Sequence, residues 1–261
     1  MIEPKKSLGQ NFLIDQNIIS KIINISPIKN NHVLEIGPGK GELTSAILEK
    51  KPRSLILIEK DTRLCKILLE KFKNIENIKI YNDDILKVNL ENKIKNGTII
   101  FGNLPYNIST QILVRLIKFI HWPPKYKKLI LMFQKEVADR ILAKKNTSSF
   151  GRLSVISNWR LKIKKSFNIS KNCFFPKPKV ESSLLVFEPI NNKRFIIKHI
   201  HNLEKVTQIL FSSKRKMINK AIKVLFKKNM SKIKTLNIEM KSRPGELSLE
   251  EYYRITEIFE K

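Results

Sequence analysis

Short apolar runs alternate with helical patterns along most of the chain, and this alternation limits the possible folds more than any other feature. The predicted strands are residues 33–36, 54–59, 78–81, 98–101, 128–133, 161–166 and 183–187. Strands that are separated by helices pair in parallel, and helices then cover both faces of the sheet. The sequence therefore predicts an α/β fold with a mostly parallel seven-stranded sheet, in which the last two strands form an antiparallel edge.

The strand patterns end near residue 190, and three helical patterns follow at about 202–228, 232–240 and 249–259. The sequence therefore predicts two domains: residues 1–190, which contain the sheet, and residues 191–261, a small all-α domain. In the first of the three helices, lysines recur on one face and apolar residues such as Ile218, Ile222 and Leu225 on the other. The basic face and the residues before it comprise Lys214, Arg215, Lys216, Lys220, Lys223 and Lys227.

The charge of the chain is strongly positive, because 51 lysines and arginines outnumber 23 acidic residues and give a net charge of +28. Charges of one sign repel one another, so this excess favours a polyanionic partner, and nucleic acid is the leading candidate. A compositional bias toward lysine would give the same total. The clustering on one helix face nevertheless favours contact with RNA or DNA phosphates.

Membrane, secreted and metal-binding proteins are disfavoured. No run approaches the roughly 20 apolar residues of a membrane span, and the first residues lack the apolar core of a secretion signal. Cys65 and Cys173 are too few for a disulfide framework or a zinc site, so no metal is expected. We therefore expect a soluble, cytoplasmic protein.

The strand at 98–101 ends in a turn that carries functional groups. Gly102 and Pro105 cannot comfortably continue a central strand. The loop that follows comprises Asn103, Leu104, Pro105 and Tyr106. An amide with both a donor and an acceptor, followed by a flat aromatic ring, is suited to hold a planar group that bears an amine. An ordinary strand-ending turn would contain similar residues.

A glycine-rich loop and a series of acidic residues follow the preceding strands. The loop contains Gly37, Gly39 and Gly41, with Glu35 just before it. Glycines let the backbone approach a ligand, and an acidic neighbour suits a cationic cofactor better than a pyrophosphate. Glu59 and Asp84 end the next two strands, where they can accept hydrogen bonds from a ribose and from an adenine amino group. The dinucleotide-binding fingerprint would need a glycine where this chain has Glu42, which disfavours a nicotinamide dehydrogenase.

These residues resemble the motifs of S-adenosylmethionine-dependent methyltransferases that modify amino nitrogens. More closely, the ordered set resembles the small-subunit ribosomal RNA adenine N6,N6-dimethyltransferase family over nearly the whole chain. The segments that carry the resemblance are residues 10–15, 35–41, 103–106, 134–139, 150–154, 174–180 and 214–216. The resemblance implies a Rossmann-like methyltransferase sheet, S-adenosyl-L-methionine as the cofactor, and no metal.

The resemblance also implies a role for each motif. The cofactor would be bound by Asn11, Leu13, Glu35, Gly37, Gly39, Gly41, Glu59, Asp84 and Asn103. Asn103 and the Leu104 carbonyl, in the loop closed by Pro105, would accept hydrogen bonds from the N6 amine of the target. Tyr106 and Phe174 would sandwich a flipped adenine, although Phe174 equally suits the core. The basic residues from Lys214 to Lys227 would contact rRNA phosphates.

The expected reaction is the transfer of two methyl groups to each of two adjacent adenosines near the 3′ end of small-subunit rRNA. The partners would be this rRNA and the assembling small ribosomal subunit, and the enzyme would act as a monomer. Two alternatives remain: a non-catalytic RNA-binding assembly factor on the same fold, and methyl transfer to an amine of a protein or small molecule. Binding of S-adenosylmethionine would distinguish the methyltransferase from a non-catalytic assembly factor. The net charge of +28 favours RNA over a protein or small molecule as the substrate.

Overall fold

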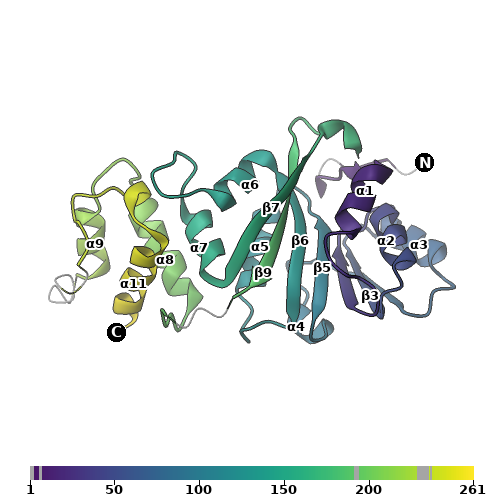
Figure 1. The fold of residues 1–261 in the computed structure, drawn as a ribbon, viewed down its shortest axis with the longest axis horizontal. Helices are drawn as coiled ribbons and strands as arrows, with labels where there is room; N and C mark the ends of the chain where they lie inside the picture. The colour runs from purple at the N-terminus through teal and green to yellow at the C-terminus, as the bar shows by residue number, and fades with distance from the viewer. Residues whose placement is uncertain (1–2, 6–7, 191–193, 228–234, 236) are drawn as a thin grey trace. The chain divides into compact units, whose positions relative to one another are not determined.

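The computed structural model describes residues 3–5, 8–190, 194–227, 235 and 237–261 (Figure 1). The chain divides into two units. Unit 1 consists of Met1–Ala138 and Ile163–Pro189, and unit 2 consists of Asp139–Lys162 and Ile190–Lys261.

The central element of unit 1 is a sheet of seven strands. The strands are β2 (His32–Ile36), β3 (Ser54–Glu59), β4 (Ile78–Asn82), β5 (Thr98–Asn103), β6 (Tyr126–Gln134), β7 (Leu161–Ile169) and β9 (Ser182–Pro189). Their order across the sheet is β4-β3-β2-β5-β6-β9-β7. The pairs from β4 to β6 are parallel, and β9 runs antiparallel to β6. The predicted α/β fold with a mostly parallel sheet is thereby confirmed.

The strand order reverses beside β2. The chain adds β3 and β4 on one side of β2, and β5 and β6 on the other side. In open α/β sheets, ligands bind beyond the carboxyl ends of the strands at such a switch point. The topology therefore places the ends of β2 and β5, and the loops that follow them, where a ligand site is expected.

The central strand β5 is buried along its length. Ile99, Ile100 and Phe101 have 0% of their surface exposed. Gly102 leaves no room for a side chain, because a Cβ atom there would lie 2.7 Å from a methyl group of Leu104 and 3.1 Å from one of Leu131. Asn103 is therefore the first polar side chain that this strand presents at its carboxyl end.

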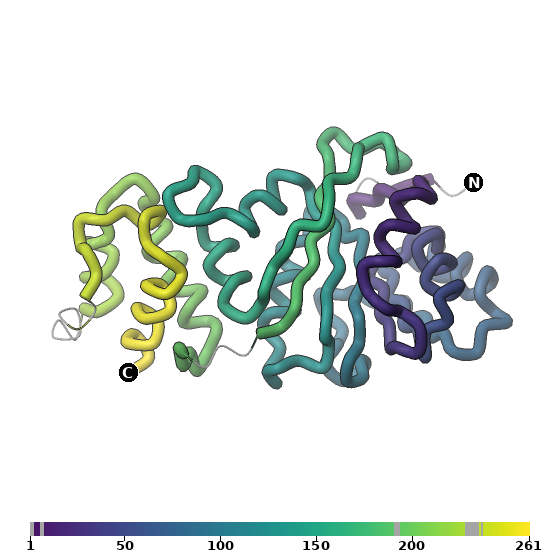
Figure 2. The backbone as a smooth tube through the Cα atoms, in the orientation of Figure 1, coloured from purple at the N-terminus to yellow at the C-terminus, as the bar shows by residue number. Residues whose placement is uncertain are grey.

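One helix of the described chain precedes β2, and five more follow β2, β3, β4, β5 and β6, one directly after each strand. They are α1 (Gln16–Ile23), α2 (Glu42–Glu49), α3 (Thr62–Lys71), α4 (Leu90–Lys93), α5 (Ser109–Ile117) and α6 (Lys135–Leu142). Figure 2 shows α1, α2 and α3, in purple and blue, gathered beside the β2–β4 half of the sheet. The carboxylates of Asp15 and Asp61 cap α1 and α3 by accepting the backbone N–H of Ile18 and of Arg63.

Unit 2 is helical and has its own apolar core. Its further helices are α7 (Arg152–Arg160), α8 (Ile200–Phe211), α9 (Asn219–Leu225) and α11 (Leu249–Glu260). Helix α8 packs against α7, α9 and α11. The core between them includes Phe150, Trp159, Leu203 and Tyr252.

Unit 2 contains more of the chain than the helical domain predicted from the sequence. The sequence places residues 139–162 with the sheet, whereas in the structure they belong to unit 2. The reason is that Phe150, Val155 and Trp159 pack in the core of the helical unit. This packing joins residues that are far apart in the sequence. The Tyr253 hydroxyl, for example, donates to the carbonyl of Val155, 98 residues earlier.

The helix predicted at 202–228 is also interrupted. Helix α8 ends at Phe211 and α9 begins at Asn219. At the break, the Ser212 hydroxyl donates to the carbonyl of Ile209 at 2.8 Å. This bond gives a carbonyl of the last turn of α8 a hydrogen-bond partner without a further helical turn. Residues 232–234 and 236 of the helix predicted at 232–240 lie outside the described residues, and residues 235 and 237–240 are not helical.

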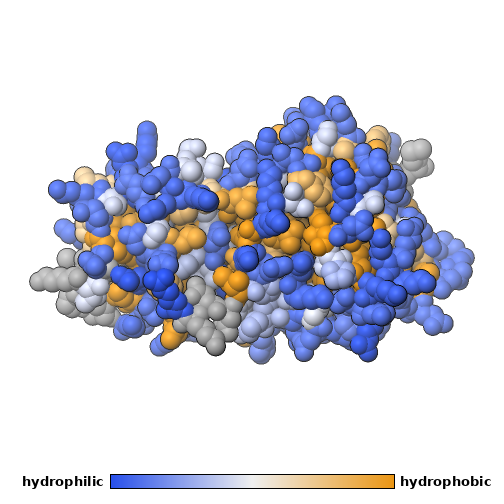
Figure 3. Space-filling view, in the orientation of Figure 1, coloured by the Kyte–Doolittle hydropathy of each residue, from blue (hydrophilic) through white to orange (hydrophobic). Residues whose placement is uncertain are grey.

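The visible surface is largely hydrophilic, with smaller apolar areas between the polar side chains (Figure 3). In the part of the chain that the structure describes, no helix combines the length and the apolar character that crossing a bilayer requires.

Candidate active site

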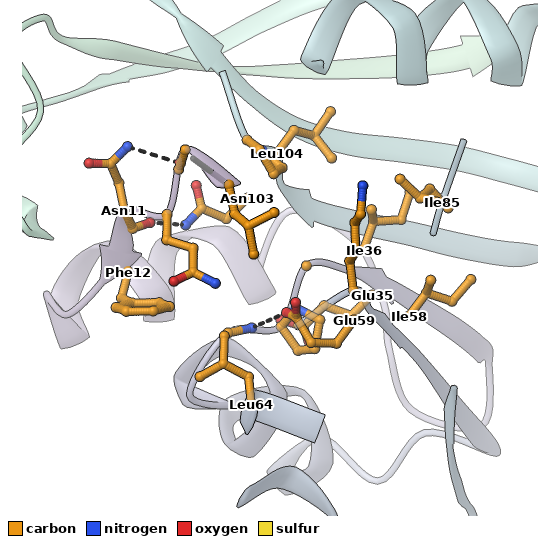
Figure 4. A pocket seen from close by; sticks show the side chains of 18 of the residues that line it. Asn11, Phe12, Glu35, Ile36, Ile58, Glu59, Leu64, Ile85, Asn103 and Leu104 are labelled. Carbon is orange, nitrogen blue, oxygen red and sulfur yellow. Dashed lines mark hydrogen bonds between the residues drawn. The ribbon is translucent and has the colours of Figure 1, made fainter. Parts of the chain in front are cut away.

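A cavity lies beyond the carboxyl ends of β2, β3 and β5, at the switch point of the sheet (Figure 4). It encloses about 1170 Å³, part of which is open to solvent. The sequence-predicted residues that line it are Asn11, Leu13, Glu35, Gly37, Gly39, Glu59, Asp84, Asn103, Leu104, Pro105 and Tyr106. The structure thus brings together residues from the N-terminal segment, the glycine loop and three strand ends.

The glycine loop turns tightly because its glycines adopt left-handed backbone angles. Gly37 and Gly39 have φ values of 69° and 61°. A Cβ atom at Gly39 would lie 2.8 Å from the ring of Phe12, so Phe12 packs directly on the loop. Gly41, with φ 84°, precedes α2 and packs against Leu68 and Phe72. The sequence predicts Gly41 as a cofactor residue, but the structure places it behind the loop, outside the cavity lining.

Two buried carboxylates stand close together in the cavity, as Figure 4 shows. Glu35 is 1% exposed and accepts a hydrogen bond from the Thr44 hydroxyl at 2.6 Å. Burial raises the pKa of Glu35 to about 7, and nearby Glu59 adds to this effect, whereas Thr44 opposes it. Burial also raises the pKa of Glu59. Two carboxylates in an apolar wall favour a ligand that carries positive charge.

Glu59 additionally fixes the glycine loop. Its carboxylate accepts the backbone N–H of Gly39 at 3.2 Å and that of Asp61 at 2.8 Å. These bonds leave further lone pairs on the two oxygens for hydroxyl groups of a ligand.

Asp84 lies at the edge of the cavity and is already paired. One oxygen accepts the backbone N–H of Leu86 at 2.9 Å, and the other lies 2.9 Å from the Lys60 ammonium. The bond from Leu86 and the charge of Lys60 lower the pKa of Asp84. Asp84 is therefore a fixed, ionised acceptor.

Asn103 is held by the N-terminal segment. Its Nδ2 donates to the backbone carbonyl of Asn11 at 2.8 Å, a bond that Figure 4 draws. Within the described residues, its Oδ1 accepts no hydrogen bond, so the oxygen is available to a donor in the cavity.

The loop after Asn103 is fixed by further bonds. The Tyr106 hydroxyl lies 2.6 Å from the Ser182 hydroxyl, and burial raises the pKa of Tyr106. The Ser109 hydroxyl donates to the Tyr106 carbonyl at 3.2 Å. The tyrosine ring is thereby held beside Asn103 at the wall of the cavity.

Comparison with known proteins gives the family. A family model that describes ribosomal RNA adenine dimethylases matches residues 1–261. The chain belongs to the ribosomal RNA adenine dimethylase family. A ribosomal RNA small subunit methyltransferase A from Pelagibacter ubique is 46% identical to it over 259 residues, which are 99% of this chain and 98% of that protein.

Solved structures agree with this placement in the adenine dimethylase family. The crystal structure of a dimethyladenosine transferase from Plasmodium falciparum has a TM-score of 0.77 and 27% identity, and covers 94% of this chain and 95% of that one. The crystal structure of the 23S rRNA methyltransferase ErmE has a TM-score of 0.68 and 22% identity, with 96% and 100% covered. The second likeness shows a shared fold. The methyltransferase sheet expected from the resemblance is confirmed.

Phe174 does not reach the cavity of this adenine dimethylase. It lies on the two-residue strand β8 (Phe174–Phe175), which pairs antiparallel with β1 (Phe12–Leu13). Phe174 is 3% exposed and packs in the core of unit 1, whereas Phe175 is 51% exposed. Successive side chains of a strand point to opposite faces, so burying Phe174 exposes Phe175. The predicted stacking role of Phe174 is therefore not supported by its position.

The basic residues predicted for RNA contact lie in unit 2, in the break after α8, along α9 and, in the case of Lys227, two residues after α9 ends. Lys214, Arg215, Lys216, Lys220, Lys223 and Lys227 are all exposed. On the other side of α9, Ile218, Ile222 and Leu225 are buried in the helical core. Lys214 donates to the carbonyl of Ser148, so its ammonium is partly engaged within the unit.

Sequence reasoning missed several residues that shape this site. Thr44 binds Glu35, Ser182 binds Tyr106, and Phe12 covers the glycine loop. Lys40 Nζ lies 5.2 Å from the centre of the Phe12 ring. Phe12 and Lys40 lie inside sequence motifs and could have been found from them. The bond between Tyr106 and Ser182 could not, because the two residues are 76 positions apart in the sequence.

Proposed function

We propose that this protein transfers methyl groups from S-adenosyl-L-methionine to N6 of two adjacent adenosines near the 3′ end of small-subunit rRNA. The observation that carries the proposal is the state of Asn103, whose amide nitrogen is occupied by Asn11 and whose oxygen is free at the cavity wall. Family membership and the similarity to a ribosomal RNA small subunit methyltransferase A support the same reaction.

The cavity fits the proposed cofactor by its donors and acceptors. Glu59 would accept hydrogen bonds from ribose hydroxyls and Asp84 from the adenine amino group. The backbone of Gly37, with Asn11 and Leu13 above it, would contact the methionine part. The buried carboxylate of Glu35 favours the positive charge of this cofactor.

S-adenosylmethionine, when bound, supplies an electrophilic methyl group. The protein's part is to orient the amine that receives it. Asn103 Oδ1 and the Leu104 carbonyl would accept the two N6 hydrogens, which keeps the lone pair of the nitrogen directed at the methyl group. Pro105 holds the loop in shape, and the face of Tyr106 would stack on the flipped adenine. Acceptors placed in advance lower the barrier because they need no reorganisation.

The proposed partners are small-subunit rRNA and the assembling small ribosomal subunit. The protein would bind them as a monomer in the cytoplasm. The exposed lysines and arginine of α9 and the preceding turn are the proposed phosphate contacts. The helical unit would thus bind the subunit while the sheet unit holds the cofactor.

The test is methyl transfer to undermethylated small ribosomal subunits, followed by nucleoside analysis for N6,N6-dimethyladenosine. We expect the wild type to form it, and Asn103→Ala to form it roughly 100-fold more slowly or not at all. Asn74→Ala, at an exposed asparagine between α3 and β4, is the matched control and should behave as the wild type. Equal product from the wild type and Asn103→Ala would refute the proposed role of the site. Subunit binding without methylation would identify an assembly factor instead.

A further inference from the structure

An exposed aromatic side chain stands next to the cavity without a role in the proposed chemistry. Phe175 is 51% exposed, although it belongs to a strand whose neighbour Phe174 is buried. Its register partner across the β1–β8 ribbon is Phe12, which lines the cavity. Paired residues of an antiparallel ribbon point to the same face, so Phe175 continues the wall of the cavity outward.

A lysine links the two rings. Lys40 Nζ lies 5.2 Å from the centre of the Phe12 ring and 6.0 Å from that of Phe175. Both distances are within the range of cation–π attraction. Lys40 itself lines the cavity, so the cation and the two rings form a continuous surface from the cavity wall to its rim.

The surroundings of this surface are apolar and basic. Ile14, the residue directly after β1, is also 51% exposed. The residues that flank β8 include three exposed lysines, Lys171, Lys177 and Lys179. The nearby Asp15 is engaged as the cap of α1. An exposed ring among cations is the arrangement by which proteins hold single-stranded nucleic acid, with the base on the ring and the phosphate near the cations.

We propose that Phe175, with Lys40 beside it, is a stacking platform for the RNA nucleotide next to the target adenosine. The inference rests on the proposed function, because it takes the strand that delivers the target base as its occupant. A strand that places one base in the cavity carries the neighbouring nucleotide to the rim, where Phe175 stands. The base of that nucleotide stacks on the exposed ring, and the Lys40 ammonium lies near the phosphate between the two nucleotides.

The experiment measures initial rates of methyl transfer against the concentration of undermethylated small subunits, at saturating cofactor. Phe175→Ala and Phe175→Leu should raise the KM for subunits about 5-fold or more, because one base stack is lost. Phe175→Trp keeps a π face and should keep the wild-type KM. Leu69→Ala, which removes an exposed apolar side chain from α3, is the control, since Leu69 is 55% exposed and away from the cavity lining.

Two further measurements separate a loss of stacking from a damaged cofactor site and from misfolding. Calorimetric titration of each variant with S-adenosylmethionine, and thermal unfolding, should give wild-type values, since Phe175 neither lines the cavity nor lies in the core. A wild-type KM for Phe175→Ala would overturn the inference. Rescue by leucine as complete as by tryptophan would also overturn it, because the side chain would then act through apolar contact with a protein. Absence of dimethyladenosine with the wild type would instead refute the proposed function.

Discussion

The Tyr106 hydroxyl lies 2.6 Å from the hydroxyl of Ser182, the first residue of β9. The bond joins the loop after β5 to a strand 76 residues later in the chain. Ser182 is fully buried, and Tyr106 is partly buried. A ring that is anchored at its hydroxyl has one orientation, and in this orientation it lines the cavity. Ser182 therefore positions the ring of Tyr106, although Ser182 itself does not line the cavity.

Removing this bond should slow methyl transfer. We expect Ser182→Ala and Tyr106→Phe each to lower kcat about 2- to 10-fold, in keeping with one neutral hydrogen bond. The double variant should be no slower than the slower single variant, because both changes remove the same interaction. Ser183→Ala, which removes the neighbouring hydroxyl that binds Asn168 at 2.8 Å, is the control and should keep the wild-type kcat. Fully additive losses would contradict the coupling.

A side chain at Gly39 should impair cofactor binding. In Gly39→Ala, the Cβ atom would lie 2.8 Å from the Phe12 ring, and the φ of 61° would be strained. Either the Phe12 ring or the glycine loop must then move, which should weaken the affinity for S-adenosylmethionine at least about 10-fold, as measured by calorimetry. Gly97→Ala has a similar strain, with φ 78°, but meets no atom within 4 Å. If both variants lose affinity equally, strain and not the contact with Phe12 is responsible.

The buried carboxylate of Glu35 should make stability depend on pH. Its pKa is about 7 in the folded protein against an ordinary value of 4.5, so the folded state retains a proton that the unfolded state releases. The contribution is fully present below about pH 4.5 and is lost as the pH rises through 7. Glu35→Gln should therefore gain free energy of unfolding relative to the wild type between pH 5 and pH 8, by up to about 3 kcal/mol.

Urea unfolding at the two pH values measures this gain. Thr44 can still donate to the glutamine oxygen, so the hydrogen bond of 2.6 Å has a partner in the variant. Glu49→Gln, at the exposed end of α2, controls for the loss of a surface carboxylate. A difference between Glu35→Gln and the wild type that is the same at both pH values would show that Glu35 is already ionised.

Charge reversal on unit 2 should weaken binding to the small subunit. The triple variant Lys216→Glu, Lys220→Glu and Lys223→Glu removes three exposed cations from α9 and the preceding turn. Its binding should lose affinity and should depend less on salt, with the slope of log K against log salt reduced by roughly 2 to 3. The affinity for S-adenosylmethionine should stay unchanged.

The control for charge alone reverses three exposed lysines of unit 1, Lys29, Lys66 and Lys79. The two triple variants have the same net charge. If both triple variants lose subunit binding equally, the net charge of the protein and not a specific contact by the α9 lysines is responsible.

The site could be predicted from the sequence to the extent that topology determines it. Glu59 and Asn103 end strands of a parallel sheet and Glu35 is the residue before such an end, and the carboxyl ends of these strands meet at one edge. Local patterns were therefore enough to bring them together. Gly41 differs from the other two loop glycines by its place at the start of α2, which local patterns do not reveal, because a glycine that starts a helix and one that faces a ligand look alike in sequence.

The structure departs from the sequence-based expectations where long-range packing decides. Strand β8 has two residues, and a register change by one would exchange the buried and the exposed faces, so Phe174 and Phe175 could not be told apart. Trp159 joins the helical core through contacts with residues far along the chain. The break between α8 and α9 begins at Ser212, whose hydroxyl donates to the Ile209 carbonyl within an otherwise continuous helical pattern.

The bond from Asn103 to the Asn11 carbonyl also sets the polarity of the site. A carbonyl can only accept, so Asn11 selects the NH2 side of the Asn103 amide and turns the oxygen the other way. Were the N-terminal segment displaced, half a rotation of the amide would present a donor to an amine that also donates, and the two would repel. The N-terminal segment therefore keeps the Asn103 amide in the one orientation that leaves its oxygen as an acceptor at the cavity wall.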